Sequence, residues 1–102
     1  MPSKKTRKDL EVLNKELGKL RARSFSEISQ LPDYSELPEA STDKKHKIAV
    51  WKDSLSEDKI RVVLQSYRRH FLGIGTVYAE GFIFNADGKV TSVEKDKLWS
   101  FM

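Results

Sequence analysis

The densest group of side chains that could bind a ligand lies at residues 67–71 (YRRHF), with Lys59 and Arg61 a short distance upstream. Arginines can neutralise phosphates while aromatic rings stack on bases, which is how some sheet surfaces hold single-stranded nucleic acid. Arg68 and Arg69 are adjacent, so in a strand they face opposite sides and cannot act together. The glycine–aromatic motif of RNA-recognition sheets is absent. Surface charges paired with acidic neighbours are the simpler interpretation of this run.

Catalysis requires a general acid or base beside a nucleophile, and the chain offers few of either. It has two histidines, His46 and His70, and its serines occur in no G-x-S-x-G motif. His70 and Glu80 lie roughly symmetrically about a turn near residues 74–75, so they could face each other across a hairpin. Proton transfer by His70 and Glu80 in a small-ligand pocket is therefore one hypothesis. The aromatic residues expected to line such a pocket are Trp51, Tyr78 and Trp99.

No metal or cofactor is expected. The two histidines are 24 residues apart and belong to no helical zinc-binding motif. The chain has no cysteine, which excludes disulfides, thiolate zinc sites, iron–sulfur clusters and cysteine nucleophiles. Gly73 and Gly75 lack the Lys-Ser/Thr pair and the following helix of a phosphate-binding loop, so a tight turn explains them.

The chain has 102 residues, of which 38% are hydrophobic and 33% charged, with a formal net charge of +4. This length predicts one small domain over residues 1–102. No window approaches the roughly 18 apolar residues of a membrane span, and the basic N-terminus precedes an amphipathic segment and not an apolar signal core. We therefore expect a cytoplasmic protein with no membrane partner.

Charge divides the chain into three parts. Residues 1–23 hold eight basic and three acidic side chains, residues 24–43 hold five acidic and no basic ones, and residues 44–102 hold eleven basic and seven acidic ones. The acidic part also contains Pro32 and Pro38, a composition typical of a connecting segment. We predict an acidic joint over residues 24–44 between an N-terminal helix and a C-terminal sheet.

The first eight residues carry four cations that would oppose the dipole of a following helix. A flexible, solubilising leader over residues 1–8 is the favoured interpretation, and an arm that binds nucleic acid or an acidic partner is the alternative. The cations are Lys4, Lys5, Arg7 and Lys8.

Leucines at positions 10, 13, 17 and 20 form the apolar stripe of an amphipathic helix, predicted over residues 9–23. Thr6 is the expected N-cap, with Asp9 three residues later. The stripe would dock on the sheet or, alternatively, bind a partner helix. Within the joint, Ser24 stands three residues before Glu27, and Pro32 would end a short helix over residues 26–31.

From residue 45 the apolar pattern changes to a period of two, which predicts strands over 47–52, 59–71, 76–85 and 89–93. Their short connections favour an antiparallel meander, and the fold class is α+β. Asn85 and Gly88 are the outer residues of an expected type I turn. Gly81, inside a strand, indicates a bulge or a bulky neighbour over the backbone. Residues 94–102 would form a helical turn that packs Leu98 and neighbouring apolar residues onto the domain.

In the second predicted strand, Ile60, Val62 and Leu64 share the core face, whereas the opposite face mixes basic and apolar side chains. Such a face favours a noncatalytic module that forms a homodimer or binds another protein. The predicted contact residues are Arg61, Val63, Tyr67, Arg69 and Tyr78. Weak electrostatic binding of nucleic acid through Lys59, these arginines and the basic leader is the alternative.

Overall fold

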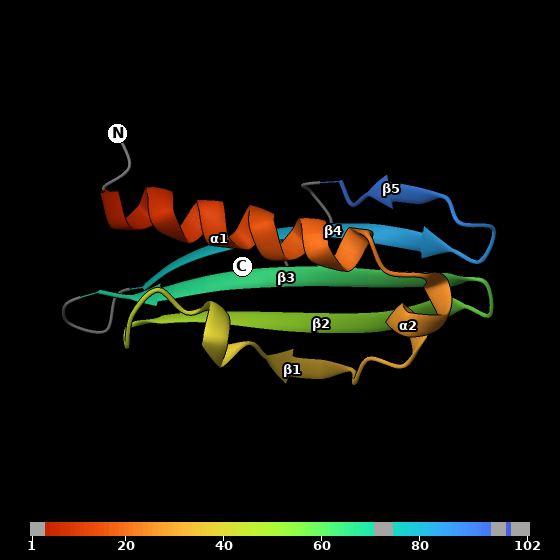
Figure 1. The fold of residues 1–102 in the computed structure, drawn as a ribbon, viewed down its shortest axis with the longest axis horizontal. Coiled ribbons are helices and arrows are strands. Elements are labelled where there is room, and N and C mark those ends of the chain that lie inside the picture. The colour runs from red at the N-terminus through yellow and green to blue at the C-terminus, as the bar shows by residue number, and fades with distance from the viewer. Residues whose placement is uncertain (1–3, 71–74, 95–97, 99–102) are drawn as a thin grey trace.

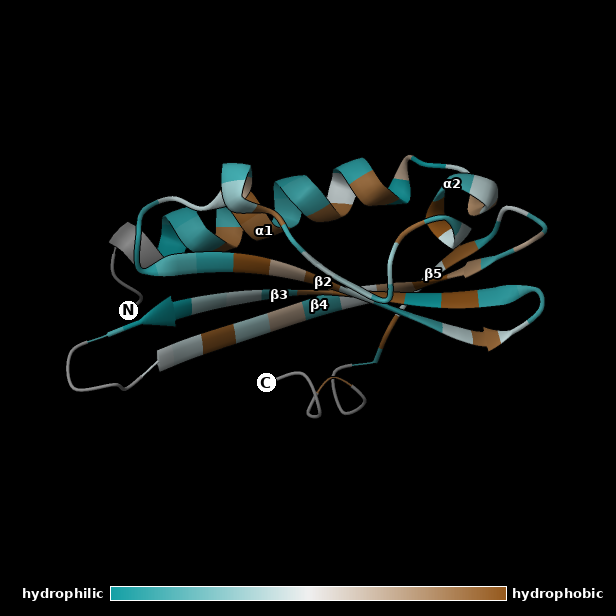
Figure 2. Ribbon diagram, turned by 90° about the horizontal axis from the view of Figure 1, so that it is seen from below, coloured by the Kyte–Doolittle hydropathy of each residue, from teal (hydrophilic) through white to brown (hydrophobic). Residues whose placement is uncertain are grey.

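A five-stranded antiparallel sheet carries two helices on one of its faces (Figure 1; Figure 2). The computed structural model describes residues 4–70, 75–94 and 98. The helices are α1 (Lys4–Arg21) and α2 (Phe25–Ser29), followed by a short 3-10 helix, η1 (Pro38–Ala40). The strands are β1 (Tyr34–Glu36), β2 (His46–Ser56), β3 (Lys59–Arg69), β4 (Gly75–Asn85) and β5 (Val90–Ser92), in that spatial order. The α+β class and the antiparallel meander are thus confirmed.

The prediction of four strands was wrong by one, because the acidic joint contains strand β1. Tyr34 pairs with Trp51 and Glu36 with Ala49 at the edge of the sheet. Two further bonds flank the strand: the Lys52 N–H donates to the Asp33 carbonyl and the Leu37 N–H to the Ile48 carbonyl, both at 2.9 Å. Pairing with β2 therefore orders a segment whose local composition is that of a loop.

The N-terminal helix begins earlier than predicted. It starts at Lys4, so Thr6 and Asp9 lie inside the helix and not at its N-cap and third position. The structure gives residues 4–8 a helical backbone, continuous with α1, where the sequence predicts a flexible leader. The second helix begins one residue earlier than expected, at Phe25, and ends two residues early, at Ser29. The Ser24 hydroxyl caps it by accepting the Glu27 N–H at 3.2 Å.

Strand β2 extends four residues beyond its predicted end at residue 52. Asp53 pairs with Arg61 and Ser54 with Ile60, and an irregularity follows at Ser56. Aspartate and serine have low strand propensity, so the sequence pattern stops before the paired segment does. The turn predicted after β4 is confirmed: the Gly88 N–H donates to the Asn85 carbonyl at 2.9 Å, and Gly88 has a φ of 94°.

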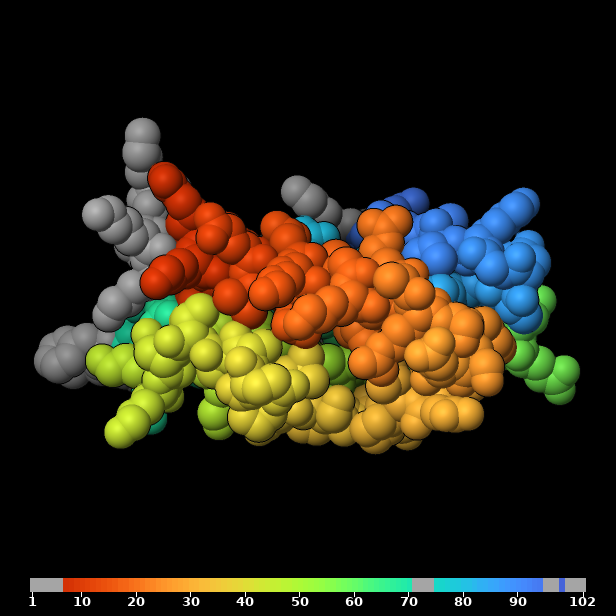
Figure 3. Space-filling model, viewed as in Figure 1, coloured from red at the N-terminus to blue at the C-terminus, as the bar shows by residue number. Residues whose placement is uncertain are grey.

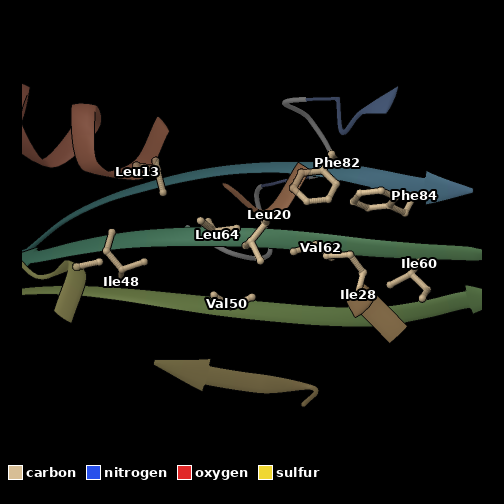
Figure 4. Close-up of a cluster of buried hydrophobic side chains, with 11 residues drawn as sticks. Leu13, Leu20, Ile28, Ile48, Val50, Ile60, Val62, Leu64, Phe82 and Phe84 are labelled. Atoms are coloured by element: carbon tan, nitrogen blue, oxygen red, sulfur yellow. The ribbon is translucent and has the colours of Figure 1, made fainter. Parts of the chain in front are cut away.

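The main core lies between the helices and the even-numbered residues of β2, β3 and β4 (Figure 4). Ile60, Val62 and Leu64 are buried there, as the alternation predicts. Leu13 and Leu20 supply the buried part of the α1 stripe, so this helix docks on the sheet. In the view of Figure 3, α1 and α2 lie over the sheet, and the segment through β1 and η1 runs along the edge beside them.

A smaller apolar cluster occupies the opposite face of the sheet. Val93 and Leu98 pack there against Val63 and Ala79, and all four are buried. A Cβ atom at Gly81 would stand 2.7 Å from the Val62 carbonyl oxygen and 3.3 Å from a Val93 methyl group. Of the two interpretations of Gly81, the close neighbour is therefore the correct one. The predicted burial of Leu98 is confirmed, while residues 95–97 and 99–102 of the expected terminal turn lie outside the described residues.

Candidate functional site

Two parts of the molecule bring polar groups together, and the first is a buried network where α1 crosses β3. Arg68 donates to both carboxylate oxygens of Asp9, from Nε to Oδ2 at 2.5 Å and from Nη2 to Oδ1 at 2.8 Å. Its Nη1 donates to Asp43 at 3.0 Å, and the Thr42 hydroxyl donates to Asp9 Oδ1 at 2.9 Å. Asp9 and Arg68 are 2% and 4% exposed. The network ties the helix to the sheet and to the segment before β2.

His46 and Ser66 complete this network, and with Asp9 they give a Ser–His–Asp set that spacing along the chain does not reveal. The His46 Nε2 lies 2.8 Å from the Ser66 hydroxyl oxygen and 3.7 Å from Asp9 Oδ1. The Thr42 N–H donates to His46 Nδ1 at 3.1 Å, so the hydrogen of the neutral ring sits on Nε2. The ring therefore donates to Ser66, whereas a general base must accept from its serine. Ser66 is also only 2% exposed, so the set is structural and not catalytic.

The charges of this network follow from burial and pairing. Burial alone would raise the pKa of Asp9, but hydrogen bonds from Arg68 and Thr42 outweigh it and hold that pKa below its ordinary value of 3.8. Burial lowers the pKa of His46 below 6.5, and the nearby Arg68 charge adds to this effect although Asp9 opposes it. Asp9 is thus ionised and His46 neutral near pH 7.

The second part is the face of the sheet opposite the helices. Beyond the cluster at Val63, this face carries an exposed aromatic pair: Tyr34 and Trp51 are 46% and 37% exposed, and their ring centroids are 4.6 Å apart. The rings are tilted by 57°, and the Tyr34 hydroxyl donates to Glu36 at 3.1 Å. Large aromatic side chains at this exposure are typical of contact surfaces.

A cationic hollow of about 310 Å³ lies at one end of this face, where β2 begins and β3 ends. Among the described residues that line it, none is acidic. Tyr67 and Arg69 were both predicted from the sequence as contact residues, and the structure places them side by side here. The lining residues are Lys44, Lys45, Lys47, Tyr67 and Arg69.

The other predicted contact residues lie elsewhere. Val63 is 1% exposed beneath Val93 and Leu98, so in this structure no partner can reach it. Tyr78 pairs with Ser66 and packs against the main core, which puts it on the helix-covered face, opposite Tyr67. Arg61 lies on the same face of the sheet as Tyr67. It stands near the start of β3, away from the hollow, and donates there to Asp53 at 2.7 Å.

The predicted pairing of His70 with Glu80 is wrong. Glu80 pairs with Leu64, and β3 and β4 close at the pair Arg69 and Gly75. The turn is therefore centred about three residues earlier than expected, so Glu80 lies six residues along β3 from His70, or roughly 20 Å. His70 instead contacts the Thr76 hydroxyl through Nε2 at 2.6 Å.

The expected ligand pocket is not assembled either. Trp51 pairs with Val63 on the open side of the sheet, whereas Tyr78 lies beneath α1. Trp99 of the expected lining and Gly73 of the glycine pair are outside the described residues.

The residues predicted for nucleic-acid binding are divided between the two ends of the sheet. Lys59 pairs with Asn85 at the start of β3, about 33 Å along the strand from Arg69. Lys4 and Lys5 lie in the first turn of α1, and Arg7 and Lys8 are exposed in the next. The Asp9–Arg68 bonds place this end of α1 near the hollow, but on the other face of the sheet.

No group of three or more histidine, aspartate or glutamate residues within 4–70, 75–94 and 98 is placed to hold a metal ion. In that same part of the chain, no helix is long and apolar enough to cross a membrane. The sequence matches no known family model, and neither a characterised protein nor a solved structure shows significant similarity to it.

Proposed function

We propose that the chain is a noncatalytic binding module that docks a protein segment on the side of its sheet opposite the helices. We call this surface the open face and define it by Tyr34, Lys47, Trp51, Tyr67 and Arg69. The observation that carries the proposal is the exposed Tyr34–Trp51 pair on the same face as the cationic hollow. Apolar area flanked by charge is the usual composition of a protein contact surface.

The polar chemistry of the chain supports binding over catalysis. In its most enclosed set of ionisable groups, Arg68 donates to Asp9, and His46 is bonded to Thr42 and Ser66. This set offers no exposed nucleophile. The open face, by contrast, carries groups suited to contact: aromatic rings and exposed cations. A rigid sheet holds these groups at fixed spacings, which lowers the entropic cost of binding.

Site-specific photo-crosslinking tests the docking surface directly. A benzoylphenylalanine at position 51 samples the open face, and one at Asp87, in the exposed turn after β4, is the matched control. The purified chain is irradiated alone and then in native lysate, and products are identified by mass spectrometry. We expect position 51, and not position 87, to give one defined protein adduct. The identified protein, once purified, should lose affinity for the Tyr67→Ala variant.

A crosslink between two copies of the chain would identify the partner as a second copy, and sedimentation at tens of micromolar would then show a dimer. Equal, diffuse labelling from both positions, or full binding of the purified partner by Tyr67→Ala, would contradict the proposal. Val63 is not a suitable probe position, because its burial makes a polar substitution there a test of folding.

Electrostatic binding of single-stranded nucleic acid is a second candidate, favoured by the four cations of the hollow around one aromatic ring. If four phosphates were neutralised, affinity for an oligonucleotide would fall with a log–log salt slope of about −3. A mobility shift with that slope would support it. An affinity that does not change with salt concentration would exclude nucleic-acid binding.

A further inference from the structure

We propose that the cationic hollow is a binding site for carboxylate side chains of an acidic peptide segment. The inference rests on the proposed docking of a protein at the open face, and it adds the chemistry of the segment that binds there. The hollow lies between the start of β2 and the end of β3, and its cations come from both strands and from the residues just before β2.

The backbone fixes where these cations stand. Lys47 pairs with Tyr67 across the two strands, and the Arg69 N–H donates to the Lys45 carbonyl at 2.9 Å. The Lys45 N–H donates to the Asp43 carboxylate at 2.9 Å, which holds the residues before the strand. Residue 47 therefore projects from β2, and 67 and 69 from β3, toward the same side of the sheet. Lys44 and Lys45 lie in the turn just before β2 and line the same hollow. Three strand positions and the turn beside them thus fix the site, even though the lysine side chains are long.

The charge of the hollow is not neutralised within the described residues. Three described cations have acidic partners, Lys19, Arg61 and Arg68, whereas several exposed lysines and arginines outside the hollow have none within the described part of the chain. What distinguishes the hollow is that four such cations gather in one place. The four cations of the hollow make no such pair with any residue that the structure describes, and all four are exposed. They are Lys44, Lys45, Lys47 and Arg69. Like charges gathered in this way repel one another, and a bound anion relieves that repulsion.

Tyr67 gives the hollow a wall, and Gly75 makes room for it. A Cβ atom at Gly75 would stand 2.5 Å from Cε2 of the Tyr67 ring and 2.8 Å from its hydroxyl oxygen. The ring thus lies across the glycine on the neighbouring strand. The hollow lies beside this ring and is lined by Lys47 and Arg69, so an anionic group bound there would stand between cations.

An acidic peptide fits this face better than a nucleic-acid strand does. Glu36 shares the open side with the hollow and pairs with Ala49, two residues from Lys47, so negative charge returns at the edge of the sheet beside the hollow. A nucleic acid running across the face would bring its phosphates against this carboxylate, whereas a peptide can confine its charge to the hollow. Trp51 is four residues from Lys47, about 13 Å along β2. An extended segment with carboxylates at one end and an apolar residue about four positions away would reach both features.

Titration of the full ¹⁵N-labelled chain with short homopolymers tests the site without knowledge of the natural partner. The probes are hexaglutamate, hexaglutamine and hexathymidylate at one ionic strength. We expect hexaglutamate to shift the amide resonances of Lys45, Lys47, Tyr67 and Arg69, and hexaglutamine to shift none of them. Hexathymidylate should bind more weakly than hexaglutamate.

Charge-reversed variants separate the site from the net charge. Lys45→Glu/Lys47→Glu should weaken hexaglutamate binding by about tenfold or more, as loss of close charge pairs does. Lys15→Glu/Lys89→Glu removes the same total charge from exposed positions outside the hollow and should change affinity by no more than about twofold. Unchanged amide dispersion confirms that each variant folds.

Equal weakening by the two variants, or shifts spread over all exposed lysines, would overturn the site, because net charge alone would then explain binding. Tighter binding of hexathymidylate would overturn the assignment to an acidic peptide and favour nucleic acid. If hexaglutamate does not bind but position 51 still crosslinks one protein, the hollow is not an anion site while the docking face stands.

Discussion

Arg68 and Asp9 are 59 residues apart in the chain, yet the guanidinium donates two hydrogen bonds to the two oxygens of one buried carboxylate. This paired geometry is the strongest form of the arginine–carboxylate interaction. It fixes both the position and the rotation of α1 on β3, since the helix can meet Arg68 in only one orientation.

Removal of one partner should therefore be costly. We expect Asp9→Ala to lower the free energy of unfolding by about 3 kcal/mol, because it leaves a buried guanidinium with only part of its compensation. The exposed pair Asp53–Arg61 is the control, since Asp53→Ala should cost no more than about 1 kcal/mol. Urea denaturation at pH 7 measures both. A cost for Asp9→Ala as small as that for Asp53→Ala would show that the buried pair does not hold the helix.

Stability should fall as the pH is lowered from 8 toward 5. The pKa of His46 is below 6.5 in the folded chain, so the unfolded chain binds more protons as the pH falls through that value. The contribution of neutral His46 is complete above an unfolded pKa of about 6.5 and is lost toward the folded pKa. Urea denaturation at a series of pH values, with His70→Gln as the control that removes the other histidine, checks this. An NMR titration showing His46 protonated at or above pH 6.5 in the folded state would contradict it.

Two glycines should respond in opposite directions to alanine. Gly81→Ala places a methyl group 2.7 Å from the Val62 carbonyl oxygen. Because that oxygen belongs to the backbone of a paired strand, it cannot easily move away, and the variant should be destabilised by about 1–3 kcal/mol. Gly18 lies in α1 with nothing within 4 Å of an added Cβ. Gly18→Ala should therefore stabilise the chain by about 0.5–1 kcal/mol through helix propensity. Thermal unfolding of both variants measures the difference, and a Gly81→Ala chain as stable as the wild type would refute the close packing beneath Val93.

The shape of the hollow can be changed without altering its charge. Gly75→Ala should displace the Tyr67 ring toward Lys47 and Arg69 and weaken hexaglutamate binding by about threefold, or roughly 0.6 kcal/mol. The same NMR titration measures the loss, and Gly18→Ala, in α1 on the other face of the sheet, serves as a glycine control. Unchanged affinity in Gly75→Ala would mean that the cations act without the wall that Tyr67 provides.

Local patterns were sufficient to predict much of this fold. Alternation identified the core residues Ile60, Val62 and Leu64, and the local pattern before Pro32 placed α2 to within two residues at each end, because both depend on near neighbours. Strand β1 was missed because Tyr34 and Glu36 become strand residues only through pairing with β2. The His70–Glu80 error arose because the centre of a hairpin depends on its turn geometry.

The sequence does contain a signal for the buried network. Asp9 is four residues before Leu13, on the core-facing side of α1, and Arg68 continues the even-numbered core face of Leu64. One acidic and one basic residue, each on a buried face, predict a mutual pair, since neither can be buried alone. The cationic hollow left a weaker signal, because Lys45 and Arg69 meet only when the register of β2 and β3 is known.

The order of the strands in the sheet also has a consequence for the route by which the chain folds. Each strand pairs with its neighbour in sequence, so the hairpins of β2, β3 and β4 can close through short loops at small entropic cost. The contact between Asp9 and Arg68 spans more than half of the chain and requires a sheet that is already in register. We therefore expect the central hairpins to form in the folding transition state and α1 to attach afterwards, so that its loss accelerates unfolding more than it slows folding.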